Sequence, residues 1–299
     1  MKGIIFIFIA AALWALDTLI RYPLLYGGVS AERIVLMEHI LLVAVLLPVF
    51  WTVKARFWEA KVSHIFSFIV IGALGSAFST LCFTEAFSLI NPSLVILLQK
   101  LQPIVAITLA AMFLGEKIQT KFLYWAMLCL VGGFLVSYKD ISVGLGGGSF
   151  WNQIFSATAF KGYGLTLLAV LGWGSSTVFG KKLSMEGYSE KEIMVGRFTM
   201  GLFALLPWWY YRGFSLGFEP MTWGKIALMV LLSGILAMYF YYAGLKRISA
   251  KVCALAETFF PFCAIVLNWV FLGKTLDNVQ LVGGALLVLG STVIQLKRY

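Results

Sequence analysis

The sequence predicts an all-α polytopic membrane protein of ten transmembrane helices, arranged as two inverted five-helix repeats around a central cavity. Three observations predict it. The chain of 299 residues is 61% hydrophobic and only 12% charged, whereas soluble domains are about 45–50% apolar and about 25% charged. The apolar residues fall into ten separate runs. The second half of the chain also repeats residues of the first half at a nearly constant distance.

Most of the apolar runs extend over about 18 residues or more, which is long enough to cross a bilayer. The expected spans are 3–22, 33–53, 64–88, 93–113, 121–138, 162–183, 191–211, 224–243, 251–272 and 279–296. The first span resembles the apolar part of a signal peptide, but it continues to Arg21 with no cleavage site. We therefore expect it to be a retained first helix.

The two halves of the chain match at many positions. Trp14 lies 159 residues before Trp173, and after a slip of one residue Pro103 lies 158 before Pro261. The match predicts three parts: a first repeat at 1–139, a glycine-rich linker at 140–160 and a second repeat at 161–299. Because each repeat has five spans, an odd number, the second repeat must enter the membrane in the opposite direction. Inverted repeats of this kind are the architecture of many secondary transporters.

The basic residues predict the orientation of the chain. With the N-terminus in the cytoplasm, the cytoplasmic segments hold 14 Lys and Arg residues and the outer segments hold 7. Cytoplasmic loops carry the excess of Lys and Arg in membrane proteins. We therefore expect both termini in the cytoplasm. The formal net charge of +10 is then a topology signal, and we expect no nucleic-acid partner.

The repeats resemble the drug/metabolite transporter superfamily, specifically exporters built from two EamA-type repeats. The motifs that carry the resemblance are the tryptophan in the first span of each repeat (Trp14, Trp173), the proline in the fourth (Pro103, Pro261) and Leu-Gly-Glu ending at Glu116. The second repeat departs from the last motif with Leu272-Gly273-Lys274. The resemblance covers almost the whole chain and is specific for fold but weak for substrate. Within the superfamily the chain is most similar to bacterial amino-acid exporters, including those for aromatic amino acids.

The resemblance implies a secondary transporter that exports small metabolites, above all aromatic or other neutral amino acids, across the bacterial inner membrane by alternating access. Drugs, amines and nucleotide derivatives are alternative substrates. A membrane enzyme or a channel is a competing class, but the chain has only two histidines and no Asp-rich motif for metal or phosphate chemistry. We expect no enzymatic activity, no cofactor and no bound metal. The expected partners are a small-molecule substrate and the lipid bilayer, with the protein a monomer or a homodimer.

Charged residues inside the spans indicate a functional site, because each costs about 2.5–3.5 kcal/mol to insert. We expect a gate at each membrane surface. Lys100 would close the outer gate by pairing with a carboxylate of the first repeat, and Arg197 would close the inner gate by pairing with Glu257. A competing interpretation pairs Asp17 with Arg21, four residues further along the helix. The candidates for gating or coupling are Asp17, Glu38, His39, Glu85 and Arg197.

The substrate is expected near the middle of the spans. An amphipathic substrate needs an apolar or aromatic wall and a few polar groups. The residues expected to bind it are Trp14, Phe78, Ser79, Gln99, Lys100, Gln102, Trp173, Ser176, Tyr239 and Glu257. Pro103 and Pro261 are expected to kink their helices, because proline lacks the backbone donor and its ring crowds the preceding turn.

Overall fold

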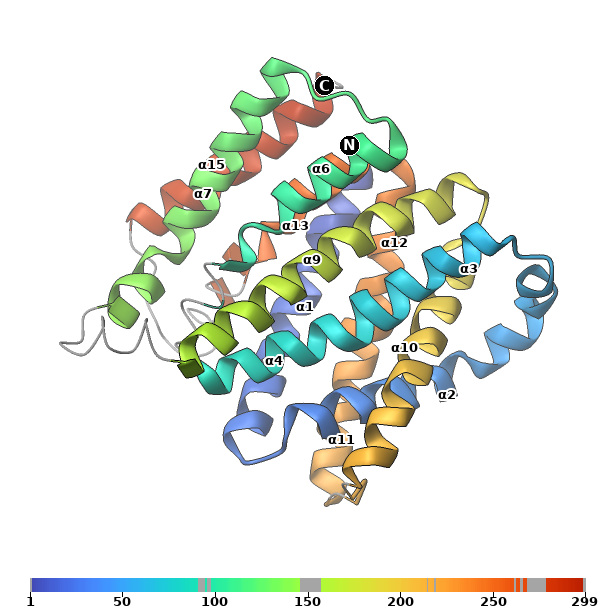
Figure 1. Ribbon diagram of the computed structural model, residues 1–299. Helices are drawn as coiled ribbons and strands as arrows, with labels where there is room; N and C mark the ends of the chain where they lie inside the picture. The colour runs from blue at the N-terminus through green and yellow to red at the C-terminus, as the bar shows by residue number, and fades with distance from the viewer. Residues whose placement is uncertain are drawn as a thin grey trace.

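The computed structural model describes residues 2–90, 95, 98–145, 157–213, 215–217, 219–260, 262–263, 266–267 and 278–297. Every regular element in these ranges is a helix (Figure 1). Pro261, Lys274 and residues 146–156 of the predicted linker lie outside the described residues.

Each of the ten predicted spans contains a helix within its described residues, and the spans 93–113 and 251–272 are described only in part. The elements of the first half are α1 (Lys2–Tyr26), α2 (Ala31–Trp58), the continuous stretch of α3 (Val62–Ile69), η1 (Val70–Phe78) and α4 (Ser79–Leu89), then α6 (Gln102–Leu114) and α7 (Thr120–Leu145). Those of the second half are α9 (Ala157–Met185), α10 (Glu190–Arg212), the continuous stretch of α11 (Pro220–Met229), η2 (Val230–Leu236) and α12 (Ala237–Arg247), then α13 (Ala250–Glu257) and α15 (Asn278–Leu296).

Several helices are suited to a lipid environment. The stretches Lys2–Tyr26, Ala31–Trp58, Val62–Leu89 and Pro220–Arg247 are each long and apolar enough to cross a membrane. Large apolar side chains also cover the outer faces of the bundle, for example Met127, Leu171 and Phe203, which are 59%, 50% and 61% exposed. An exposed apolar surface of this extent is unfavourable in water and favourable in lipid.

The helix contacts of the two halves are exchanged. α4 packs on α9, and its counterpart α12 packs on α1; η1 packs on α10, and its counterpart η2 packs on α2. α6 likewise packs on α9 while α13 packs on α1, and α7 lies against α15 (Figure 1). In each of these cases, when a helix of the first half packs on a helix of the second half, the counterparts of the two helices also pack on each other.

Glycines let the helices of these pairs approach closely. A Cβ added at Gly72 of η1 would lie 2.6 Å from Met200 Cβ and 3.1 Å from Gly201 N of α10. One added at Gly132 of α7 would lie 2.6 Å from the Gly283 carbonyl of α15. Small residues of this kind are the usual means by which membrane helices pack without a hydrophobic driving force between them.

Two π-helical segments occupy matching places in the halves. η1 interrupts the stretch Val62–Leu89, and η2 interrupts the stretch Pro220–Arg247. Adding 158 to Phe78, the last residue of η1, gives Leu236, the last residue of η2. π-Helical turns are rare and often lie at functional sites.

A second pair of interruptions lies beside the predicted kink prolines. The chain turns at Lys100–Leu101 before α6 begins at Gln102, which places Pro103 in the first turn of that helix. α13 ends at Glu257, and the chain turns at Thr258–Phe259. Adding 158 to Lys100 gives Thr258, so the two turns are equivalent. Proline favours this arrangement, since a missing donor costs nothing in the first turn of a helix.

Candidate functional site

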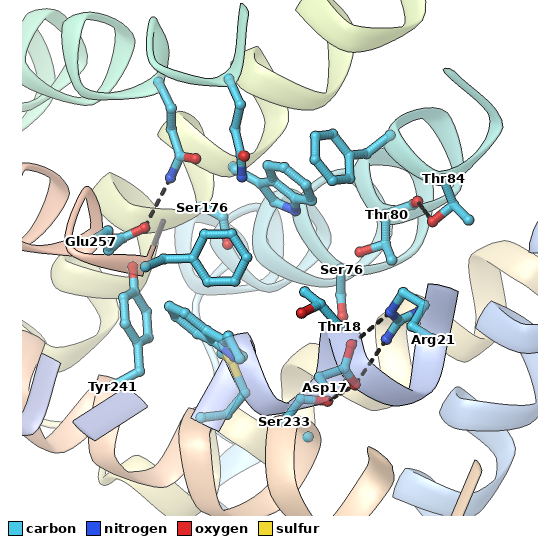
Figure 2. A pocket seen from close by; sticks show the side chains of 18 of the residues that line it. Asp17, Thr18, Arg21, Ser76, Thr80, Thr84, Ser176, Ser233, Tyr241 and Glu257 are labelled. Atoms are coloured by element: carbon cyan, nitrogen blue, oxygen red, sulfur yellow. Dashed lines mark hydrogen bonds and ion pairs between the residues drawn. The ribbon is translucent and has the colours of Figure 1, made fainter. Parts of the chain in front are cut away.

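The irregular segments surround a cavity of about 280 Å³. Ser76 of η1 and Ser233 of η2 line it, as do Lys100 and Thr258 of the two turns. The remaining walls come from α1, α2, α4, α6, α9, α10, α12 and α13. Figure 2 labels lining residues of α1, α4, α9, α12 and α13. The cavity therefore lies between the two halves. Irregular backbone is tolerated at membrane depth where it lines such a cavity.

The cavity lies nearer to one end of the bundle, and the other end is packed. Its lining from α1 begins at Trp14 and continues to Leu25 in the C-terminal half of that helix. At the opposite end the Glu116 carboxylate accepts hydrogen bonds from the backbone N–H groups of Ala250 (2.8 Å) and Lys251 (3.2 Å) at the start of α13. We call this end, where the two halves are joined by such bonds, the packed end.

An ion-paired triad forms one wall. Arg21 Nε lies 2.7 Å from Asp17 Oδ2, and Arg21 Nη2 lies 2.6 Å from Glu38 Oε1. Ser233 Oγ donates a third bond to Asp17 Oδ1 at 2.8 Å (Figure 2). Asp17 and Glu38 are both buried. Arg21 can serve both because it lies one helical turn after Asp17 on α1 and reaches across to α2.

Glu257 forms a second polar group on the other side of the cavity in the view of Figure 2. Its carboxylate accepts hydrogen bonds from Gln102 Nε2 (2.9 Å), Thr177 Oγ1 (3.3 Å) and Cys253 Sγ (3.6 Å). Tyr241 supports the group, since its hydroxyl donates to Thr177 Oγ1 at 2.9 Å. The three donors to the carboxylate are neutral, so the acid is held by hydrogen bonds at the end of α13.

Arg197 of α10 forms a third group. Its Nη1 donates to Ser176 Oγ (2.6 Å) and Tyr242 OH (3.1 Å), and its Nη2 donates to the Gly75 carbonyl of η1 (3.3 Å). The predicted pairing of Arg197 with Glu257 is thus replaced by separate networks. Ser176 and Thr177 are neighbours on α9, and consecutive helical residues point to different faces. They hold Arg197 and Glu257 apart.

His39 joins α2 to η1. Its Nδ1 lies 2.7 Å from the Val35 carbonyl, and its Nε2 lies 3.1 Å from Ser76 Oγ. Because a carbonyl only accepts, Nδ1 must carry the proton, and Nε2 of the neutral ring can then accept from Ser76. Gly201 leaves the space for this ring, since a Cβ there would lie 2.7 Å from His39 Nε2.

Aromatic side chains complete the walls. The Trp14 ring lies 5.5 Å from the Tyr241 ring, and the Phe83 ring lies 4.8 Å from the Trp173 ring. The two tryptophans come from equivalent helices of the two halves. The cavity thus offers apolar faces as well as charged groups, the combination that ligand sites commonly show.

Most of the residues expected from the sequence line the cavity. They are Trp14, Asp17, Glu38, His39, Gln99, Lys100, Gln102, Pro103, Trp173, Ser176, Arg197 and Glu257. Four others lie elsewhere. Phe78 and Tyr239 face outward and are each 43% exposed. Ser79 is buried against Gly172 of α9, and Glu85 lies on α4 outside the lining.

Several lining residues could be predicted from the sequence only in part or not at all. Arg21 is expected only as a partner of Asp17 on the same helix, and the structure makes it the ion partner of both Asp17 and Glu38. Its spacing of four residues from Asp17 was the available signal. Ser233, Thr177 and Tyr241 are ordinary polar residues of apolar spans, and only the packing of the helices brings them to the cavity.

A membrane-embedded helical bundle with a polar and aromatic cavity between two matching halves has the form of a membrane transporter. Comparison with known families agrees. The model of the EamA-like transporter family matches residues 1–138 and again residues 160–296. The chain therefore belongs to the EamA-like transporter family.

Individual relatives are also transporters by name. A protein of Fusobacterium nucleatum named riboflavin transporter ImpX is 28% identical, over 97% of this chain and 96% of its own length. The uncharacterized transporter YetK of Bacillus subtilis is 23% identical, over 91% of this chain and 82% of its own length. A solved crystal structure superposes with a TM-score of 0.75 at 17% identity, covering 99% of this chain and 98% of that one. This last similarity concerns the fold alone.

Proposed function

We propose that this protein is a secondary transporter that exports a small aromatic metabolite across the bacterial inner membrane by alternating access. The observation that carries the proposal is the cavity between two halves whose helix contacts are exchanged. Such an exchange is expected if ten spans form two inverted repeats, which can rock against each other around a fixed site. With both termini in the cytoplasm, the packed end faces the cytoplasm and the cavity lies toward the outside.

Two substrate classes suit the lining. Aromatic amino acids, which the resemblance to bacterial amino-acid exporters implies, are supported by the opposite charges of Arg197 and Glu257 beside aromatic rings. A flavin is supported by the similarity to the protein named riboflavin transporter. Ligand pockets commonly enclose about 300–1,000 Å³, so a cavity of about 280 Å³ favours the smaller of the two, the amino acid.

Transport in proteoliposomes tests the proposal. Purified protein would be reconstituted and the movement of labelled phenylalanine, tryptophan and riboflavin followed in both directions, with and without a proton gradient. We expect saturable movement of at least one compound above that of protein-free liposomes. Trp14→Ala removes a cavity wall and should lower the rate about tenfold or more, because the aromatic contact area is lost.

Tyr239→Ala is the matched control, since this aromatic residue lies outside the lining and is 43% exposed. It should transport at the wild-type rate. Failure of all three compounds to move would overturn the proposed substrate class. Equal losses in Trp14→Ala and Tyr239→Ala would show that the cavity is not the transport site.

A further inference from the structure

Arg197 is a buried cation whose hydrogen bonds go to neutral groups. It is only 8% exposed. Its bonds to Ser176 Oγ, Tyr242 OH and the Gly75 carbonyl all end on uncharged oxygen atoms. Its Nε is also buried and makes no hydrogen bond to any residue of the described part of the chain. Three of the five guanidinium donors are thus used, and none of these three bonds is with a carboxylate.

The other arginine of the cavity shows the contrast. Arg21 makes ion pairs with two buried carboxylates, Asp17 and Glu38. A buried charge normally has such a partner, because its lost hydration is not recovered from neutral groups alone. Glu257 takes its hydrogen bonds from Gln102, Thr177 and Cys253 instead of Arg197. The charge of Arg197 therefore remains available to a ligand at the cavity wall.

The position of Arg197 is fixed before a ligand arrives. Its three anchors come from different elements: Ser176 from α9, Tyr242 from α12 and Gly75 from η1. A guanidinium group held in one orientation loses little entropy on binding, and its planar fork matches the two oxygens of a carboxylate. The anchors thus hold the guanidinium in one orientation at the cavity wall.

We propose that Arg197 binds the carboxylate of the substrate and thereby selects carboxylate-bearing aromatic metabolites over analogues that lack the carboxylate. The inference rests on the proposed function and names the group that decides specificity within it. The aromatic walls at Trp14 and Trp173 would hold the ring of the same substrate. Arg197 would then be the residue that separates an amino acid from an amide or a flavin.

Equilibrium binding to the purified protein tests this. Labelled phenylalanine would be displaced by unlabelled phenylalanine, phenylalaninamide and riboflavin, and direct binding of labelled riboflavin would be measured in parallel. We expect the wild type to prefer phenylalanine over its amide by about 10- to 100-fold, the range of a hydrogen-bonded charge. Arg197→Gln should lose this preference, and Arg197→Lys, which keeps the charge but not the fork, should retain part of it.

Arg212→Gln is the matched control. Arg212 pairs with Glu32 at 3.1 Å outside the cavity, so its loss should leave the preference unchanged. Arg197→Lys also guards against a folding failure of Arg197→Gln, because an undiminished preference in the lysine variant would by itself contradict recognition by the guanidinium fork.

Three outcomes overturn the inference while leaving the transporter proposal intact. The wild type binds riboflavin but not phenylalanine; the wild type binds phenylalanine and its amide equally; or Arg197→Gln weakens both equally, which indicates a structural role alone. Failure of phenylalanine, phenylalaninamide and riboflavin all to bind and to be transported overturns the proposed substrate class itself.

Discussion

Arg21 illustrates how much of the site depends on a single residue. The spacing of Asp17 and Arg21 is visible in the sequence and predicts a pair on one helix face. The third member, Glu38, lies on another helix, and its bond to Arg21 at 2.6 Å depends on how α1 and α2 pack. Local spacing could therefore predict one of the two ion pairs of the triad, the pair of Asp17 and Arg21. The same holds for Glu257, whose donors come from α6, α9 and its own helix.

Arg21→Gln should destabilise the protein strongly. The change leaves Asp17 and Glu38 buried without their cation, and breaking a buried pair typically costs about 3–5 kcal/mol. Arg212→Gln, at a pair whose arginine is 52% exposed, should cost about 1 kcal/mol or less. Thermal unfolding in detergent measures both. The double variant Arg21→Gln/Glu38→Gln should recover part of the loss, and a melting temperature of Arg21→Gln equal to wild type would contradict the account.

At the scale of elements, the cavity is built where helices are irregular. The turns at Lys100–Leu101 and Thr258–Phe259 could be anticipated, because proline follows each in the sequence. The π-helical segments η1 and η2 could not be anticipated. A membrane span is apolar on most of its faces, so a wider helical turn does not change its apolar pattern. The close helix contacts at glycines could be predicted in part. The sequence shows where the glycines are, but it does not show which helix each one contacts.

Gly72→Ala should disrupt the contact between η1 and α10. The added methyl group would collide with the Arg197 carbonyl and with Met200 Cβ, and overpacking typically costs about 1–3 kcal/mol. Gly164→Ala is the control, because its position in α9 is exposed and has no atom within 4 Å. That change should be neutral or stabilising, since alanine is the better helix former. A lower melting temperature for Gly164→Ala than for Gly72→Ala would contradict the close packing of η1 on α10 at Gly72.

Glu116 should hold the packed end closed. Its carboxylate accepts from the first N–H groups of α13, where a negative charge also interacts favourably with the helix dipole. Loss of a helix cap costs about 0.5–2 kcal/mol. Glu116→Ala should therefore raise the equilibrium constant for opening of the packed end by about 2- to 30-fold. The readout is maleimide labelling of the buried Cys253 in a variant without the other cysteines. The control is Glu59→Ala, at an exposed residue after α2, in which Cys253 should be labelled as slowly as in the parent variant. An unchanged labelling rate in Glu116→Ala would show that Glu116 does not hold the packed end closed.

At the scale of the whole molecule, the fold was the most predictable part. The apolar composition predicted a helical membrane protein, and the described residues form helices, four of them long and apolar enough to cross a membrane. The motifs of the two repeats predicted the family, whose model matches residues 1–138 and 160–296. The cavity was less predictable, because its charged networks join residues far apart in the chain, such as Ser76 with His39 and Arg197 with Tyr242. The free-energy cost of placing a charge in the membrane predicted that the charged residues are functional, but it could not predict which residues they contact.

The central claim is that the two halves must move against each other for transport. Arg56 and Glu186 offer the most direct test, because Arg56 Nη2 donates to the Glu186 carbonyl at 3.2 Å across the packed end and both side chains are exposed. In a variant without the native cysteines, Arg56→Cys/Glu186→Cys would be joined by a short, reducible thiol cross-linker, with each single variant as a control. The account predicts that cross-linking abolishes substrate movement in proteoliposomes, that reduction restores it, and that substrate binding persists throughout. Transport at an undiminished rate by the cross-linked protein would contradict alternating access.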